Sequence, residues 1–165
     1  RLIIEKLMEL ENAGYSYEAA LASFEMLVMK ILGTHREFFQ LEGFRVINEL
    51  ATSGEQVEAT IKVNVDGRRE HTAADGNGPV NALDKALRKA LVPFYPELNE
   101  VSLTDFKVRV INAKDATEAR VLVQISSTDG KRRWTTVGAS ENIIEASWLA
   151  LVDSIDYKLL NSRNA

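Results

Sequence analysis

Two patterns of apolar residues divide this chain. Up to Gly33 the apolar residues recur at helical spacing, which predicts one helix ending before Gly14 and a second helix that Ser16 caps and Gly33 ends. From Phe44 onward the apolar residues alternate with polar ones, and the alternation is strict from Val57 to Val65. That period is typical of half-buried strands. We therefore predict a pair of helices followed by a region built on strands.

The strand region repeats the same succession of elements. In the first copy, a hairpin turn at Asp66-Gly67 leads into a returning strand, and a helix then runs to Leu91. In the second copy, Asp129-Gly130 makes the turn, and a helical stripe runs from Ile144 to Leu159 after a cap at Ser140. The pattern predicts an α+β fold of duplicated β-β-β-α units that form a pseudo-twofold domain.

The two hairpins can be aligned on their Asp-Gly pairs. This alignment matches His71 with Trp134 and Thr72 with Thr135. Because the counterpart of His71 is then an indole, which cannot act as an acid or base, we assign His71 a structural role.

Composition narrows the possible chemistry. The 165 residues contain no cysteine and two histidines, and 20 Lys and Arg face 24 Asp and Glu, for a formal net charge of −4. These counts exclude disulfides, cysteine nucleophiles and a histidine-rich metal site, and they argue against a generally basic nucleic-acid-binding protein. Ser126, Ser127 and Thr128 have no base placed to activate them. We expect no catalytic residue and no metal site in this chain.

The turn Gly76-Asn77-Gly78-Pro79 precedes the helix of the first copy. Glycines before a helix let backbone N–H groups face a carboxylate or a phosphate, aided by the helix dipole. The same glycines also suit a strand-to-helix turn that binds nothing. The spacing is not that of a dinucleotide-binding loop. A double-stranded RNA-binding domain would need lysines where this chain has Val80, Asn81 and Ala82.

Two long segments resemble a known family. Residues 71–84 are similar to the first-repeat signature of the C-terminal regulatory domain of the isopropylmalate and citramalate synthase family, and residues 134–148 to its second-repeat signature. The helices of residues 1–33 resemble the linker subdomain that joins this module to a catalytic barrel. Residues 94–98 and 152–160 are most similar to the citramalate synthase branch.

The resemblance implies a domain plan. Residues 1–35 would be the end of a helical linker subdomain, residues 36–160 a regulatory domain, and residues 161–165 a tail. Within the regulatory domain, the first repeat would span about 43–95 and the second about 100–160. Because the chain begins at Arg1 within a predicted helix, we expect a piece of a larger, cytoplasmic protein.

The resemblance also implies a function. The parent enzyme would condense acetyl-CoA with pyruvate to (R)-citramalate, using a divalent metal in a catalytic barrel. This chain would need no cofactor of its own, would form a homodimer, and would bind isoleucine as a feedback inhibitor. Matching family motifs select eight effector-binding residues: Gly76, Gly78, Val80, Asn81, Leu103, Phe106, Val110 and Thr117. A leucine-sensing domain of a 2-isopropylmalate synthase and a dimerisation module without ligand remain the alternatives.

Overall fold

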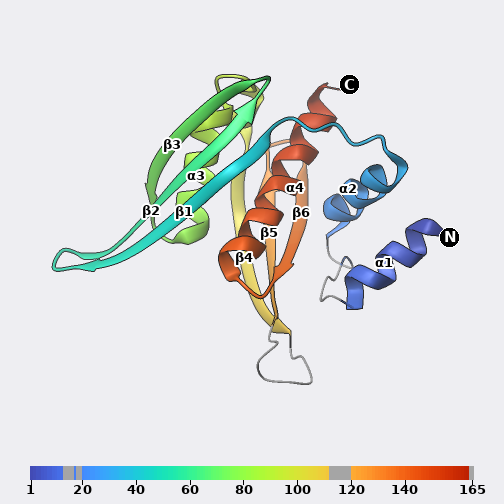
Figure 1. Cartoon of the computed structure of the whole chain (residues 1–165), viewed down its shortest axis with the longest axis horizontal. Helices are drawn as coiled ribbons and strands as arrows, with labels where there is room; N and C mark the ends of the chain where they lie inside the picture. Colours follow the sequence, from blue (N-terminus) through green and yellow to red (C-terminus); the bar gives the residue numbers. More distant parts are fainter. Residues whose placement is uncertain (13–16, 18–19, 112–119, 164–165) are drawn as a thin grey trace. The chain divides into compact units, whose positions relative to one another are not determined.

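The computed structural model describes residues 1–12, 17, 20–111 and 120–163 (Figure 1). In chain order its elements are α1 (Leu2–Asn12), α2 (Leu21–Leu32), β1 (Gln40–Ala51), β2 (Gly54–Val65), β3 (Arg68–Gly76), α3 (Pro79–Leu91), the 3₁₀ helix η1 (Pro96–Glu100), β4 (Ser102–Ile111), β5 (Arg120–Thr128), β6 (Arg133–Ser140) and α4 (Ile143–Arg163). The described residues form two antiparallel sheets, of strand order β1-β2-β3 and β4-β5-β6. A helix follows each sheet, so the predicted α+β fold of duplicated β-β-β-α units is confirmed.

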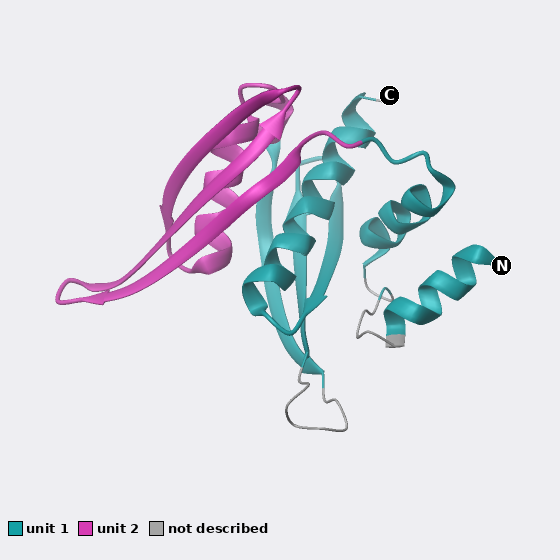
Figure 2. Ribbon diagram, in the orientation of Figure 1, with its two compact units in different colours: residues 1–36, 100–165 teal, residues 37–99 magenta. Residues whose placement is uncertain are grey.

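The chain divides into two compact units, coloured separately in Figure 2. The first-repeat unit comprises residues 37–99 and holds β1, β2, β3 and α3. The second-repeat unit comprises residues 1–36 and 100–165 and holds α1, α2, β4, β5, β6 and α4. The helical segment at the start of the chain therefore belongs with the second repeat, from which β1 to α3 separate it in sequence.

The core of the first-repeat unit lies between its sheet and α3. Every second residue of β2 from Val57 to Val65 is buried, and Leu83, Leu87 and Leu91 of α3 are fully buried. Thr72 Oγ1 of β3 donates to the Ala86 carbonyl at 2.7 Å and ties the helix to the sheet. The strict alternation in the sequence thus marks one buried and one open sheet face.

The second-repeat unit has an equivalent hydrogen bond between a strand threonine and the following helix, but the threonine is one residue later than the alignment on the Asp-Gly pairs predicts. Thr136 Oγ1 donates to the Ala150 carbonyl at 2.8 Å, which makes Thr136, not Thr135, the counterpart of Thr72. The prediction that Trp134 corresponds to His71 is therefore wrong. His71 corresponds to Thr135, and Trp134 is a buried core residue whose Nε1 donates to the Ser154 carbonyl at 3.1 Å.

The misalignment comes from the hairpin turns. Asp66 and Gly67 both lie at positive φ and form the whole turn between β2 and β3. In the second hairpin Asp129 precedes the turn, and its carboxylate accepts from the backbone N–H groups of Lys131 and Arg132 at 3.0 and 2.8 Å. The pairs Asn64–Arg69 and Thr128–Arg133 enclose the same number of residues, so the Asp-Gly pair occupies different positions in two turns of equal length.

The helix ends agree only partly with the predicted caps. Gly33 ends α2 in the left-handed conformation, as predicted. Helix α2 begins at Leu21, and Gly14 and Ser16 lie outside the described residues. Ser140 does not cap α4, because it belongs to β6. Asn142 Oδ1 caps that helix by accepting from the Ile144 N–H at 2.8 Å.

Candidate functional site

The turn before α3 contains two glycines with different roles. Gly76 ends β3, and a Cβ atom added there would lie 2.4 Å from the Ala82 nitrogen and 2.8 Å from Asn81 Oδ1. Such contacts are shorter than any that real side chains show, so Gly76 is needed for the strand to approach the helix. Gly78 has an extended backbone, with φ −172° and ψ 176°, and a Cβ there would meet nothing within 4 Å. The space beside Gly78 is therefore open.

The first turn of α3 carries no side-chain cap. Its N-cap residue is Gly78, whose carbonyl accepts from the Ala82 N–H at 3.0 Å but which offers no side-chain acceptor. Pro79 opens the helix, and no described group accepts from the N–H groups of Val80 and Asn81. Unpaired N–H groups and the positive end of the helix dipole favour an anion at this position.

The equivalent end of α4 is closed by the chain itself. Asn142 Oδ1 accepts from the N–H groups of Ile144 and Glu145 at 2.8 and 3.4 Å. Ser140 Oγ accepts from the Asn142 N–H and donates to the Glu145 carboxylate, both at 3.1 Å. The two repeats share a fold but differ at the helix start, where only α3 presents free donors among the described residues.

Asn81 stabilises the turn from within the helix. Its Oδ1 accepts from the Asn77 backbone N–H at 3.1 Å, so one of the two lone pairs on this oxygen is used by the protein. The second lone pair of this oxygen remains for a donor of a ligand, such as an ammonium group. Asn81 and Val80 are both half-buried.

A second set of predicted residues lies on β4, an edge strand. Phe106, Val108 and Val110 lie opposite Ile125, Val123 and Val121 of β5, respectively. They share a sheet face with the buried Ile125 and Val123, yet they are 43%, 42% and 60% exposed. Helix α4 packs on β5 and β6, which leaves the apolar side of β4 open.

A β-bulge brings Leu103 onto the same face. Its partner is Ser127, whereas the partner of Phe106 is Ile125, because Thr104 is the extra residue in the register. Without the bulge, the odd spacing of three would place Leu103 and Phe106 on opposite faces. The side chains of Leu103, Phe106, Val108 and Val110 thus form one row, which we call the β4 stripe.

The predicted site residues fall on both units. Gly76, Gly78, Val80 and Asn81 belong to the first-repeat unit, and Leu103, Phe106 and Val110 to the second-repeat unit. Thr117 lies outside the described residues. The motif comparison left out Val108, although it lies in the middle of the β4 stripe; strict alternation with Phe106 and Val110 was the signal that could have found it.

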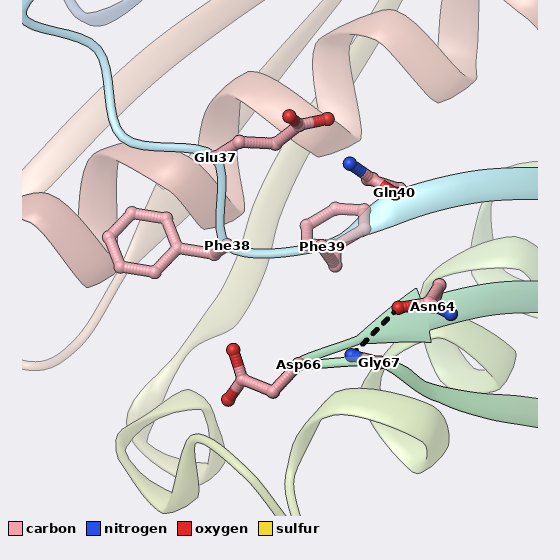
Figure 3. A pocket seen from close by; sticks show the side chains of 7 residues that line it. All are labelled: Glu37, Phe38, Phe39, Gln40, Asn64, Asp66 and Gly67. Atoms are coloured by element: carbon pink, nitrogen blue, oxygen red, sulfur yellow. Dashed lines mark hydrogen bonds between the residues drawn. The ribbon is translucent and has the colours of Figure 1, made fainter.

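A hollow near the start of β1 offers no convergent chemistry (Figure 3). It measures about 390 Å³ and is lined by Glu37, Phe38, Phe39, Gln40, Asn64, Asp66 and Gly67. Asn64 Oδ1 accepts from the Gly67 N–H at 3.0 Å. In Figure 3 the carboxylates of Glu37 and Asp66 point away from each other. The hollow contains no predicted effector residue, and its two acids do not meet on a shared position.

The described part of the chain has neither a cluster of metal-binding side chains nor a helix that could span a membrane. Among residues 1–12, 17, 20–111 and 120–163, no three His, Asp or Glu side chains gather as metal ligands would. No helix in those ranges has the length and apolar character required to cross a bilayer.

Comparison with known proteins shows which family the chain belongs to. Residues 18–159 match the family model of the LeuA allosteric (dimerisation) domain. The chain is 56% identical over 162 residues to an (R)-citramalate synthase of Geobacter sulfurreducens, covering 97% of this chain and 31% of that protein. It is 52% identical over 164 residues to an (R)-citramalate synthase of Aquifex aeolicus, covering 96% and 30%.

A more distant relative carries the name of a different enzyme. A 2-isopropylmalate synthase of Methylobacterium nodulans is 34% identical over 140 residues, which cover 85% of this chain and 25% of that protein. The chain spans less than a third of the length of each of these relatives. It belongs to the LeuA allosteric (dimerisation) domain family, and within that family it is more similar to these (R)-citramalate synthases than to the 2-isopropylmalate synthase.

Proposed function

We propose that this chain is the amino-acid-binding regulatory part of an (R)-citramalate synthase, and that isoleucine is its ligand and feedback inhibitor. The similarity of 52 to 56% to two (R)-citramalate synthases supports this assignment. The condensation of acetyl-CoA with pyruvate, and the divalent metal that it uses, would belong to a catalytic barrel outside these residues. The chain would act in the cytoplasm as a homodimer.

The open N-terminus of α3 carries the proposal. A free amino acid has a carboxylate, which suits the unpaired N–H groups of Val80 and Asn81 and the dipole of α3. The extended backbone and open space at Gly78 leave room for that carboxylate. The matching position in α4 is filled by Asn142, so one carboxylate would bind per chain.

The β4 stripe, which belongs to the second-repeat unit, is by itself an apolar surface of the kind that a branched aliphatic side chain covers. Phe106 and Val110 expose 43% and 60% of their surface, and covering them with a branched side chain would bury apolar area on both sides. Since a buried methylene contributes roughly 0.8 kcal/mol, isoleucine and leucine, which have equal numbers of carbons, would differ mainly through pocket shape. Leucine would therefore bind at the same position, but more weakly than isoleucine.

Two alternatives predict different binding. A leucine-sensing domain would bind leucine more tightly than isoleucine, and a dimerisation module would bind neither. The lower identity of 34% to the 2-isopropylmalate synthase disfavours the first alternative. The open helix start disfavours the second, because a turn with a purely structural role would gain stability from the type of cap that α4 has.

The variant Gly78→Asp tests the proposal in the full-length enzyme. The added side chain would enter the space where the ligand carboxylate approaches, and its negative charge would occupy the helix start. We expect turnover close to that of the wild type and an isoleucine concentration for half-inhibition raised by at least about tenfold, equivalent to roughly 1.4 kcal/mol of binding free energy. Inhibition kinetics with isoleucine, leucine and valine measure this effect.

Two controls make the result interpretable. Gly78→Ala adds a methyl group without charge at a position where the backbone accepts any residue, so it should weaken inhibition less than Gly78→Asp does. Circular dichroism should show that both variants fold, since Asp is a good N-cap residue. If folded Gly78→Asp enzyme is inhibited by isoleucine as the wild type is, the effector does not bind at this turn.

A further inference from the structure

The face of the β1-β2-β3 sheet opposite α3 contains a hollow that the proposed effector site does not use. It measures about 380 Å³, and its lining includes Gly43 and Arg45 of β1, Thr60 and Lys62 of β2, and His71 of β3. These residues alternate with the buried residues that face α3, so they lie on the open face of the sheet. We propose that this hollow binds a small phosphate-bearing ligand.

The register of the strands places the basic side chains together. Lys62 lies directly opposite His71 on one side and opposite Gly43 on the other. Side chains in directly opposite positions have Cβ atoms about 5 Å apart, and Gly43 has no side chain to fill the third position. Arg45 lies in the next row, opposite Thr60. Three strands thus contribute to one concave surface.

The basic side chains of this hollow are unpaired among the described residues. No hydrogen bond or ion pair joins the side chains of Arg45, Lys62 or His71 to another residue in the described part of the chain. Glu42, which also lines the hollow, is already paired with Arg69. The acidic side chain at the rim is therefore neutralised, and the centre of the hollow is positive in a chain whose formal net charge is −4.

The second repeat shows what this face looks like without such a site. The counterparts of Lys62 and His71 are Ser126 and Thr135, which lie opposite each other and share a hydrogen bond of 3.1 Å. The counterpart of Arg45 is Lys107, whose Nζ lies 3.6 Å from the Asp105 carboxylate. Every one of these positions is satisfied within the second repeat, whereas no described residue pairs with Lys62 or Arg45 in the first repeat.

Lys62 and Arg45 place two positive charges in neighbouring rows of the same sheet face, and an anion bound between them relieves their repulsion. Lysine and arginine bind phosphate oxygens through charge-assisted hydrogen bonds, and the Thr60 hydroxyl adds a neutral donor. A volume of about 380 Å³ lies within the range of small-molecule sites. A phosphate-bearing ligand therefore fits the charge, the donors and the space of the hollow.

Titration of the full chain with pyrophosphate tests the proposal. The experiment uses isothermal calorimetry at constant ionic strength, with orthophosphate as a second probe, and nuclear magnetic resonance to locate the shifted amides. We expect one pyrophosphate per chain, shifts at residues 43–45, 60–62 and 71, and weaker binding of orthophosphate. Lys62→Gln should weaken pyrophosphate binding at least about tenfold, the lower end of the typical loss for one charge-assisted contact.

The matched control is Lys107→Gln on the second sheet. Lys107 corresponds to Arg45 but is paired with Asp105, so this variant should bind pyrophosphate as the wild type does. The proposal is overturned if about 10 mM pyrophosphate does not saturate the wild type. A dissociation constant that weak corresponds to a smaller binding free energy than a specific site provides. It is also overturned if both variants lose affinity for pyrophosphate equally. A Lys62→Gln variant that alters only the sedimentation coefficient would overturn it too, because the face would then contact a second copy of the chain.

Discussion

Lys158 of α4 is a buried cation with two acidic partners. Its Nζ donates to Asp129 at 2.8 Å and to Glu100 at 2.9 Å, and its side chain is 7% exposed. Hydrogen bonds from Lys158 and from the Arg132 backbone hold the pKa of Asp129 well below its usual range. Burial lowers the pKa of Lys158, but the hydrogen bonds to Asp129 and Glu100 outweigh this effect and raise it. One side chain therefore anchors both the β5–β6 turn and the end of η1.

We predict that Lys158→Met destabilises the chain by roughly 1–3 kcal/mol at pH 7, because Asp129 loses its charged partner. A carboxyl whose pKa is lowered by folding stabilises the protein above its unfolded pKa of about 3.9 and loses that contribution as the pH falls further. The difference between wild type and variant should therefore shrink below about pH 4. Urea unfolding at several pH values measures it.

The exposed Lys131 in the same hairpin provides the control. Lys131→Met should change the free energy of unfolding by less than about 0.5 kcal/mol at every pH. A Lys158→Met effect that stayed constant down to pH 2 would show that packing, not the ion pair, causes the loss.

At the scale of elements, α2 completes the second-repeat unit by covering the edge of β6. Ser23 Oγ accepts from the Val137 backbone N–H at 2.9 Å and donates to Asp153 of α4 at 2.8 Å. Lys30 Nζ lies 3.5 Å from the same carboxylate, and burial raises the pKa of Asp153 against the effects of Lys30 and Ser23. Ser23 therefore joins α2, β6 and α4 through one buried hydroxyl.

We predict that Ser23→Ala destabilises the second-repeat unit by roughly 1–3 kcal/mol, since it leaves the buried Val137 N–H without an acceptor. Hydrogen exchange at the Val137 amide should become faster in the variant. Ser53→Ala, in the exposed turn between β1 and β2, should change neither the stability nor the exchange at Val137. Unchanged protection of Val137 in Ser23→Ala would contradict this role.

At the scale of the whole molecule, the chain exposes apolar side chains on its edge strands. The β4 stripe has Val108 exposed by 42% at its centre, and β1 exposes Ile47 by 44%. Clustered apolar surface of this kind is commonly covered by association, and identical chains most often associate as twofold dimers. The membership of the chain in an allosteric (dimerisation) domain family agrees with this expectation.

We therefore predict a homodimer in sedimentation experiments at concentrations on the order of 10 µM. Val108→Asp, which places a charge in the β4 stripe, should weaken dimerisation by at least about tenfold. Leu50→Asp, at an isolated position on the β1–β2 hairpin that is 86% exposed, should leave the dimer unchanged. A wild-type chain that sediments as a monomer would refute the prediction.

Local patterns in the sequence determined most of the elements. Strict alternation from Val57 to Val65 identified a strand with one buried face, because successive side chains point to opposite sides. Gly33 identified a helix end and Asp66-Gly67 a hairpin, because both need positive φ angles that few other residues adopt. The duplication followed from the order of these elements, and the family followed from two long motifs.

The tertiary structure decided which side chains meet. The bulge at Thr104 places Leu103 and Phe106 on one face, and hydrogen bonds to Ala86 and Ala150 align Thr72 with Thr136. A shift of one residue moves a strand side chain to the opposite face, and sequence spacing alone contains no signal for a bulge or for the position of an Asp-Gly pair within its turn. For the same reason, the cationic hollow around Lys62 became visible only when the strand register was known.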